Sequence, residues 1–192
     1  MSWAWLLVGV AYVIGMTPSA IAVGRLAGVD PVRSGSGNPG ASNVYRLAGK
    51  RFGLAVLLAD VAKGALPVAL GLLADGRALG AACWCAAALG HIFPIARRFR
   101  GGKGVATTGG GVLVLFPLIG LVLLAVFFLV LRLVKTASIG SMTIAALLPV
   151  LVAAWGRPGW EIAVSAAVAL LVLVRHESNI RRLLGRSEPT IH

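Results

Sequence analysis

The chain has 192 residues, of which 58% are hydrophobic and 12% are charged, and its mean hydropathy is +0.91. Soluble domains are roughly 45 to 50% apolar, so this composition excludes an ordinary soluble domain and predicts an integral membrane protein with several spans. Lys and Arg number 18 against 6 Asp and Glu. Nucleic-acid-binding proteins carry such an excess on a soluble face that this chain lacks, so we expect no nucleic acid partner. The basic residues lie between or after the apolar runs, which suits lipid headgroups, orientation in the bilayer and small anionic substrates.

The first half of the chain predicts three membrane spans, because about 20 apolar residues cross the hydrocarbon core of a bilayer. The first span covers residues 3–24 and begins without the basic residues of a cleaved signal peptide. Residues 52–74 and 78–96 form the second and third spans, on either side of a short outer turn. By the positive-inside rule, the basic segments 25–51 and 97–104 face the cytoplasm and the amino end lies outside.

The stretch 105–131 decides the topology. A single crossing there would place the basic residues that follow on both sides of the membrane, whereas two short segments broken near Pro117 keep the basic residues of 132–135 and of the tail in the cytoplasm. Residues 137–155 and 160–174 complete the spans. We therefore expect an all-α polytopic helical bundle of about seven transmembrane segments, with the amino end out and the carboxyl end in.

Two local patterns predict how helices are placed. The glycine run 109–111 permits close helix packing or a break. In the carboxyl-terminal tail, Ile180, Leu183 and Leu184 share one face with arginines around them, a pattern typical of a helix that lies at the headgroup surface. Glu188 follows in this tail, and we expect it to be a solvated charge.

A polar, glycine-rich loop, RSGSGNPGASNVYR at residues 33–46, interrupts the apolar chain. Because glycine reaches positive φ without steric cost, such a loop can turn its backbone N–H groups inward around an anion. Arg46 can add a forked, charged partner for a phosphate. The alternative is a flexible linker between spans, which needs no particular residue at any position. The candidate anion-binding residues are Gly35, Ser36, Gly37, Asn38, Gly40 and Arg46.

A second basic loop, GGKG at residues 101–104, again combines glycines with a cation, Lys103. It is not an ATP-binding P-loop, because an arginine stands where that motif needs its first glycine and Gly104 stands where it needs Ser or Thr. An ATPase is therefore excluded, and a plain phosphate cradle is left. Its residues are Gly101, Gly102, Lys103 and Gly104.

Four ionisable residues in or beside the spans each admit two interpretations. His91, near the inner end of the third span, is a functional candidate at that depth or a histidine that hydrogen-bonds a neighbouring helix. His176, at the membrane interface, can meet a soluble substrate or be a solvated histidine at a helix end. Asp60 and Lys63 are three residues apart on one face of the second span, where they either neutralise each other structurally or belong to a site.

Missing motifs narrow the reaction class. Neither His91 nor His176 is followed by an acidic residue at the fifth position, so the HxxxxD arrangement of thioester-using glycerolipid acyltransferases is absent. No GxSxG elbow surrounds Ser36. The 6 acidic residues are scattered along the chain, which argues against a magnesium-dependent phosphotransferase, and we expect no metal and no cofactor.

Three segments, GSGNPGASNVYR, GHIFPIARRFRGGKGVAT and RHESNIRRLLGRSE, together resemble the three cytoplasmic motifs of the bacterial acyl-phosphate:glycerol-3-phosphate acyltransferase family. Length, hydropathy and motif order also match, so the resemblance covers the whole chain and implies a single transmembrane acyltransferase domain of residues 1–192. The family usually has Thr where this chain has Ser42, and often another residue where it has Pro39. Neither departure removes a side-chain ligand.

The resemblance implies transfer of a fatty acyl group from acyl-phosphate to the sn-1 hydroxyl of glycerol 3-phosphate, giving 1-acylglycerol 3-phosphate (lysophosphatidic acid) and phosphate in phospholipid biosynthesis. Neither acyl-CoA nor acyl carrier protein would be the direct donor. Because an acyl-phosphate is already activated, the protein needs only to bring two phosphate-bearing molecules together, and we expect no covalent acyl-enzyme. The expected form is a monomer among the lipids of the bacterial inner membrane, with its active site on the cytoplasmic face.

The resemblance also implies roles for individual residues. Ser36 and the glycine loop with Lys103 would hold phosphate. Four residues would gather around glycerol 3-phosphate, namely Arg46, Ser138, His176 and Asn179. The catalytic residues expected from this are Ser36, Arg46, Lys103, His176 and Asn179, and the substrate-binding residues are Gly35, Gly37, Asn38, Gly40, Asn43, His91, Gly101, Gly102, Gly104 and Ser138.

The proton released by the glycerol hydroxyl is expected to go to the departing phosphate, with His176 and His91 as competing bases. The rival function from another class is a small transporter or channel for an organic anion. Such proteins show charges or broken helices near mid-membrane, often repeated between two halves, whereas this chain shows only Asp60 and Lys63 there and no convincing internal repeat. A lipid-binding scaffold, the third possibility, leaves the ordered Gly, Asn and Lys residues unexplained.

Overall fold

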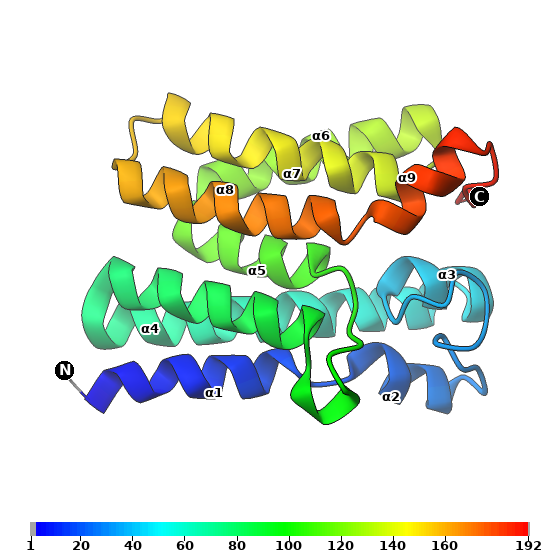
Figure 1. The fold of residues 1–192 in the computed structure, drawn as a ribbon, viewed down its shortest axis with the longest axis horizontal. Coiled ribbons are helices and arrows are strands. Elements are labelled where there is room, and N and C mark those ends of the chain that lie inside the picture. Colours follow the sequence, from blue (N-terminus) through cyan, green and yellow to red (C-terminus); the bar gives the residue numbers. More distant parts are fainter. Residues whose placement is uncertain (1–2, 192) are drawn as a thin grey trace. The chain divides into compact units, whose positions relative to one another are not determined.

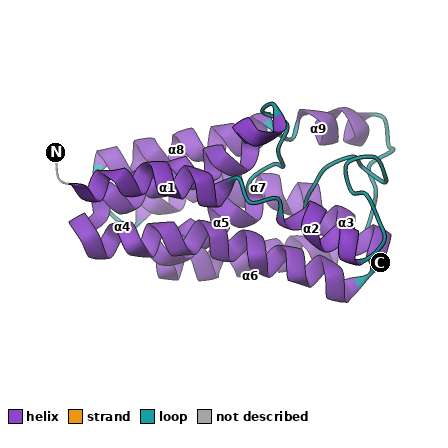
Figure 2. Cartoon of the chain, turned by 90° about the horizontal axis from the view of Figure 1, so that it is seen from below, coloured by secondary structure: helices purple, strands orange, loops and turns teal. Residues whose placement is uncertain are grey.

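The computed structural model describes residues 3–191, and every regular element in that range is a helix (Figures 1 and 2). The chain separates into two compact units, the first ending at Leu115 and the second beginning at Phe116. The first unit contains η1 (Trp3–Trp5), α1 (Leu6–Gly15), α2 (Ser19–Leu26), α3 (Ala41–Ala48), α4 (Lys50–Ile92), η2 (Ile95–Arg97) and α5 (Val105–Leu115). The second contains α6 (Pro117–Val134), α7 (Ala137–Ala154), α8 (Gly159–Val174) and α9 (Glu177–Leu184). The all-α prediction is confirmed.

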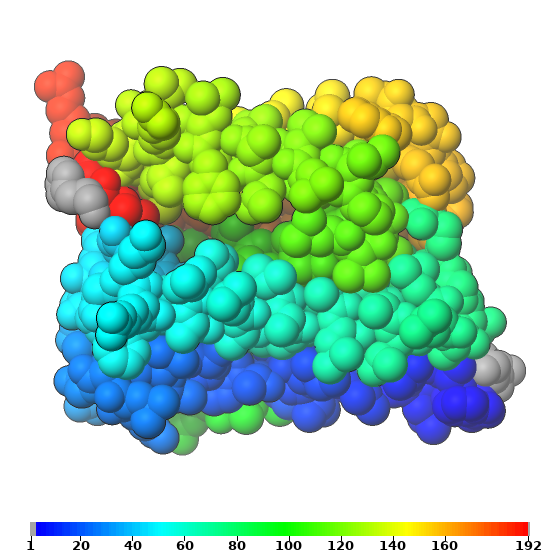
Figure 3. Space-filling model, turned by 180° about the vertical axis from the view of Figure 1, so that it is seen from behind, coloured from blue at the N-terminus to red at the C-terminus, as the bar shows by residue number. Residues whose placement is uncertain are grey.

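The first predicted span, residues 3–24, is broken into two helices. The break follows from Pro18, which lacks a backbone N–H and disfavours helical backbone at the residue before it. The hydroxyl of Thr17, the residue before it, donates to the Ile14 carbonyl at 2.7 Å. Both helices pack on α4, and Figure 3 shows α1 and α2 (blue) lying along the first part of α4 (cyan to teal).

Helix α4 reverses direction in its middle. Asp75 and Gly76 have non-helical backbone angles, with Gly76 at φ 73°, a conformation that glycine adopts readily. A Cβ added to Gly71 would lie 3.0 Å from the Cα of Gly80, so the two arms of α4 lie in direct backbone contact. These arms correspond to the second and third predicted spans, and the reversal corresponds to the predicted outer turn.

Helix α5 packs closely on α4 because glycines of each helix face the backbone of the other. A Cβ on Gly110 would lie 2.1 Å from the Val61 carbonyl oxygen, and one on Gly64 would lie 1.9 Å from the carbonyl oxygen of Thr107. Gly109 has nothing within 4 Å of a Cβ at its position. Of the two roles predicted for the glycine run 109–111, close helix packing is therefore the one that the structure shows.

The predicted break near Pro117 is confirmed. Phe116 has φ −137° and ψ 67° and separates α5 from α6. The two segments differ in length: α5 has 11 residues, and α6 has 18 and continues beyond residue 131 to Val134. In the second unit, the buried Leu123, Leu148 and Val172 come from α6, α7 and α8.

Residues 3–191 contain four helical stretches that are long and apolar enough to cross a membrane, or five if α8 and α9 count as one bent span. One of the four is the stretch Lys50–Arg97, which contains the reversal of α4. Apolar side chains such as Leu118, Leu121 and Leu129 are exposed on α6, as expected of a surface that faces lipid. The count of about seven segments and the orientation of the termini stay predictions.

Candidate active site

The first polar loop is closed over one buried amide side chain, that of Asn43 on the first turn of α3. Its Oδ1 accepts the N–H of Ser36 at 3.0 Å, and its Nδ2 donates to the carbonyls of Pro31 at 2.8 Å and Ser34 at 3.0 Å. Gly35 has φ +62°, and a Cβ there would lie 2.4 Å from the Asn43 Oδ1. The loop therefore has a defined shape, contrary to the flexible-linker interpretation, and Asn43 supports it from beneath.

The same loop brings Ser36 and Arg46 together. Arg46 lies on α3, and its Nη2 donates to the Ser36 hydroxyl at 3.5 Å. A hydroxyl and a guanidinium side by side form a set of donors that suits a phosphate. Gly37 also has a left-handed backbone, with φ +69°, and the Gly40 N–H donates to the Asn38 carbonyl at 2.9 Å. The predicted residues of this loop thus form one local cluster in the first unit.

The second loop, residues 101–104, is bound to the end of α4. The Gly101 N–H donates to the Ile92 carbonyl at 3.1 Å, and the Gly102 N–H donates to the His91 carbonyl at 3.2 Å. These two N–H groups therefore serve the fold instead of lining an anion cradle as predicted. The reason is packing: a Cβ at Gly101 would lie 2.0 Å from the His91 carbonyl oxygen. Of the residues predicted to hold phosphate at this loop, Lys103 is then the main candidate.

In the second unit, Ser138 of α7 and Asn179 of α9 meet on the carboxylate of Glu188. Ser138 Oγ donates to Glu188 Oε1 at 2.7 Å, and Asn179 Nδ2 donates to the same oxygen at 2.5 Å. Arg182 Nε donates to Oε2 at 2.7 Å. The structure thus brings together Ser138 and Asn179, which the resemblance predicted as site residues. They meet through Glu188, which was not predicted to belong to the site.

The prediction that Glu188 is a solvated tail charge was wrong, since its side chain is only 8% exposed. Burial raises the pKa of Glu188, whereas hydrogen bonds from Ser138, Asn179 and Arg182 and the positive charge of Arg182 lower it, and the net shift is downward. Glu188 is therefore ionised at neutral pH. Its position at the end of the third motif was the signal in the sequence that could have marked it.

His176 precedes α9 and is buried, with 2% of its surface exposed, so it is not a solvated histidine at a helix end. Its Nδ1 lies 2.8 Å from the Val172 carbonyl oxygen. Because a carbonyl oxygen can only accept, Nδ1 carries the proton, and Nε2 is the basic nitrogen of the neutral ring. This tautomer suits a general base or a hydrogen-bond acceptor for a hydroxyl.

His91, Asp60 and Lys63 lie in one buried cluster in the first unit, with Asp60 Oδ1 2.8 Å from Lys63 Nζ. Sequence reasoning missed two further members, Ser19 and Thr107, for which no local pattern gave a signal. Among residues 3–191, no group of three or more His, Cys, Asp or Glu side chains could hold a metal ion.

Comparison with known proteins finds the same family as the three sequence motifs. A family model described as glycerol-3-phosphate acyltransferase matches residues 5–186. The glycerol-3-phosphate acyltransferase of Syntrophotalea carbinolica is 43% identical over 192 residues, covering 98% of this chain and 97% of that protein. The Bacillus subtilis protein of the same name is 39% identical, covering 97% and 96%.

Two solved structures are also similar to this chain in fold and sequence. The crystal structure of PlsY (YgiH), an integral membrane glycerol 3-phosphate acyltransferase, in its glycerol 3-phosphate form is 31% identical, with a TM-score of 0.95 over 100% of this chain and 96% of that one. Its lysophosphatidic acid form matches with a TM-score of 0.92 over the same shares of the two chains.

Proposed function

The chain belongs to the glycerol-3-phosphate acyltransferase family, and on that premise we propose that it transfers a fatty acyl group from acyl-phosphate to the sn-1 hydroxyl of glycerol 3-phosphate. The hydroxyl oxygen attacks the acyl carbonyl carbon, the bond from that carbon to the phosphate oxygen breaks, and lysophosphatidic acid and phosphate are released. The name of the matching PlsY structure in its lysophosphatidic acid form supports this product. The reaction belongs to phospholipid biosynthesis.

The donor we propose is acyl-phosphate, and neither acyl-CoA nor acyl carrier protein. An acyl-phosphate is a mixed anhydride that reacts with a hydroxyl once the two are held together, so an enzyme needs mainly to position two anions and screen their repulsion. The sequence offers basic loops for this task and no GxSxG elbow for an acyl-enzyme.

The observation that carries the proposal is the paired Ser36 hydroxyl and Arg46 guanidinium, 3.5 Å apart on a loop that Asn43 holds closed. We assign this pair and Lys103 to the phosphate-bearing substrates. In the second unit we assign Ser138, His176 and Asn179 to glycerol 3-phosphate. The further substrate-binding residues proposed from the resemblance are Gly35, Gly37, Asn38, Gly40 and Gly104. The other residues that the resemblance implied, Asn43, His91, Gly101 and Gly102, are proposed to hold the two loops in shape.

For the proton of the attacking hydroxyl, we propose the departing phosphate as acceptor. His176 is the strongest side-chain competitor, since its Nδ1 donates to Val172 and its Nε2 is then basic. Replacing a true general base by Ala lowers turnover by roughly 10²- to 10⁴-fold. If His176→Ala or His91→Ala lowers kcat by about 10³-fold while both KM values stay unchanged, the histidine is the base and the phosphate is not.

The experiment that tests the function is an assay of the purified protein with labelled glycerol 3-phosphate and palmitoyl-phosphate, with lysophosphatidic acid as the product measured. Palmitoyl-CoA and palmitoyl-acyl carrier protein are the matched donors, and we expect product from palmitoyl-phosphate alone. Product from a thioester donor would contradict the proposed donor. No product, together with uptake of glycerol 3-phosphate into vesicles that contain the protein, would favour the transporter.

The membrane placement we propose is a single transmembrane acyltransferase domain of about seven segments, with its amino end outside and its carboxyl end inside. The positive-inside pattern of the basic segments supports this orientation, and the break at Phe116 supports two segments in place of one. We propose a monomer among the lipids of the bacterial inner membrane, with its active site on the cytoplasmic face.

A further inference from the structure

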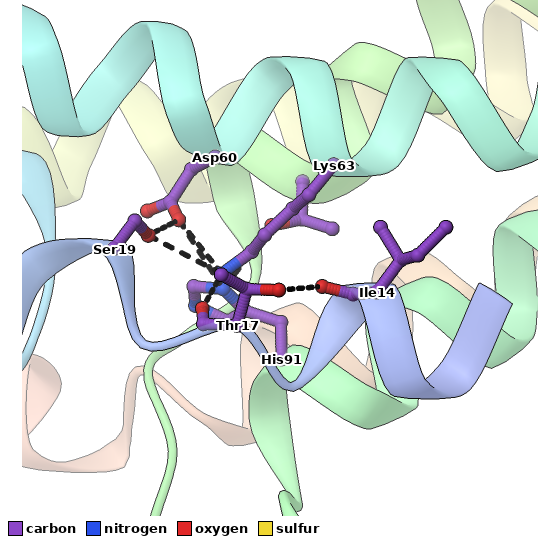
Figure 4. Close-up of polar contacts among 7 residues, drawn as sticks. Ile14, Thr17, Ser19, Asp60, Lys63 and His91 are labelled. Atoms are coloured by element: carbon purple, nitrogen blue, oxygen red, sulfur yellow. Dashed lines mark hydrogen bonds and ion pairs between the residues drawn. The ribbon is translucent and has the colours of Figure 1, made fainter. Parts of the chain in front are cut away.

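A cluster of buried polar side chains links the break between α1 and α2 to the first arm of α4 (Figure 4). Lys63 Nζ lies 2.8 Å from Asp60 Oδ1, and it donates to the Thr17 carbonyl at 2.9 Å and to the Ser19 hydroxyl at 3.4 Å. The Ser19 hydroxyl in turn donates to Asp60 Oδ1. The Lys63 and Asp60 side chains are only 7% and 3% exposed. The ion pair therefore has the partners that a buried pair needs.

The cluster continues from Asp60 to His91 on the second arm of α4. His91 Nδ1 lies 3.8 Å from Asp60 Oδ1 and 3.1 Å from the Thr107 hydroxyl. The hydroxyl on α5 lies within hydrogen-bond distance of this nitrogen and the carboxylate on the first arm of α4 lies just beyond that distance, so the two together favour one orientation of the imidazole. The His91 side chain is 8% exposed, so little water competes for these contacts.

The opposite edge of the His91 ring faces the second basic loop. A Cβ added to Gly102 would lie 2.2 Å from His91 Nε2, and the Gly102 N–H donates to the His91 carbonyl at 3.2 Å. A small pocket is lined by Lys63, His91 and Gly102. The orientation of the His91 ring therefore sets where Gly102 lies, and with it the residue that follows, Lys103.

We propose that Asp60, Lys63 and His91 are positioning residues that hold the loop 101–104, and with it Lys103, in the conformation that binds a substrate phosphate. This inference rests on the proposed function. Lys63 neutralises Asp60 and ties it to Ser19, Asp60 orients His91, and the ring of His91 supports Gly102. None of the three needs to touch a substrate.

Steady-state kinetics with both substrates test the inference, with Lys103→Met as the reference variant. We expect Asp60→Asn and His91→Gln each to raise, by about tenfold, the same KM that Lys103→Met raises. We also expect Asp60→Asn to change this KM little in a chain that already carries Lys103→Met, because residues that act through one group are not additive. Asp75→Asn is the matched control, since Asp75 is exposed at the reversal of α4, and it should keep wild-type kinetics.

A double variant, Asp60→Asn with Lys63→Met, separates positioning from folding. Asp60→Asn alone leaves Lys63 as an uncompensated buried charge, and the double variant removes that charge as well. We expect the double variant to recover thermal stability and to keep the raised KM. Recovery of both the stability and the wild-type KM would overturn the inference, as would a fall in kcat with both KM values within about twofold of wild type.

Tryptic cleavage of the protein in detergent gives a readout that does not depend on activity. The segment 97–103 contains four basic residues, and a loop released from His91 should be cut faster, by about fivefold or more, in the double variant. Unchanged cleavage would overturn the inference even if the enzyme is active. If the wild-type protein makes no lysophosphatidic acid, the proposed function fails, and the cleavage rates still report whether His91 and Asp60 hold the loop.

Discussion

Glu188 collects hydrogen bonds from donors that lie 50, 9 and 6 residues away in the chain, on Ser138, Asn179 and Arg182. A buried carboxylate is stable only when such donors replace the water that it loses. This single side chain joins the start of α7, the helix α9 and the tail after α9. The donors Ser138 and Asn179 are also those we assign to glycerol 3-phosphate, so Glu188 keeps them in fixed positions.

Replacing Glu188 by Gln should destabilise the second unit. The amide keeps the shape of the carboxylate but has one acceptor oxygen where the carboxylate has two, so its NH₂ group faces a donor. Hydrogen bonds to a charged group contribute about 1.5 to 3 kcal/mol each, and we expect a loss of about 2 kcal/mol and a thermal midpoint lower by roughly 4 to 8 °C. Thermal unfolding of the two proteins in detergent measures this difference in midpoint.

Glu177→Gln is the matched control for this variant, because Glu177 pairs with Arg181 on the surface with its side chain 68% exposed. Exposed ion pairs contribute at most about 1 kcal/mol. Equal shifts for the two variants would contradict the anchoring role of Glu188.

The stabilisation from Glu188 should depend on pH in a predictable direction. The pKa of Glu188 is lower in the folded protein than that of a free glutamate, which is about 4.3. The contribution of the ionised group is therefore fully present above about pH 4.3 and is lost as the pH falls through the folded pKa. The stability difference between wild type and Glu188→Gln should be constant from about pH 8 to 5 and shrink below about pH 4. A difference that already disappears near pH 6 would contradict this assignment.

At the scale of elements, the contact of α5 with α4 depends on which glycine faces the partner helix. Gly109 and Gly110 are neighbours in α5, yet a Cβ on Gly110 would lie 2.1 Å from a backbone oxygen of α4 and one on Gly109 would meet nothing within 4 Å. A backbone atom cannot move aside as a flexible side chain can. The two positions therefore have opposite tolerance to the same substitution.

Gly110→Ala should destabilise the protein by about 1 to 3 kcal/mol, the usual cost of overpacking a tight contact. Gly109→Ala should be neutral or stabilising by about 0.5 to 1 kcal/mol, because alanine has the better helix propensity. Thermal midpoints of the two variants measure the difference. If Gly110→Ala is as stable as Gly109→Ala, the close approach of α5 to α4 is wrong.

At the scale of the whole molecule, the orientation in the membrane is testable by labelling single cysteines after both native cysteines are replaced by Ala. We expect a membrane-impermeant maleimide added outside the cell to label a cysteine at Gly76 but not one at Lys135 or Arg186, because the positive-inside rule places basic ends in the cytoplasm. Inverted vesicles should give the opposite pattern. Labelling at Lys135 from outside would contradict the two-segment interpretation of residues 105–131.

The sequence by itself determined the features that depend on neighbouring residues. Apolar runs predicted the helices, and the short outer turn predicted the reversal at Asp75 and Gly76. Pro117 marked the break after α5, whereas the comparable break at Pro18 was overlooked within an apolar run. The three motifs indicated the family that the comparisons then showed. These features follow from local hydropathy, backbone geometry and residue identity, which a single segment carries by itself.

Only the tertiary structure decided which polar groups meet. Lys63 bonds to Thr17, 46 residues away, and Glu188 is buried although its own segment is polar. Asp60 lies 2.8 Å from Lys63 Nζ, as the spacing in the sequence allowed, but its position 3.8 Å from His91 Nδ1 depends on how the two arms of α4 pack. Such pairings depend on helices that lie far apart in the chain. The free energy of burying a charge is set by all of its neighbours together, and no single segment contains that information.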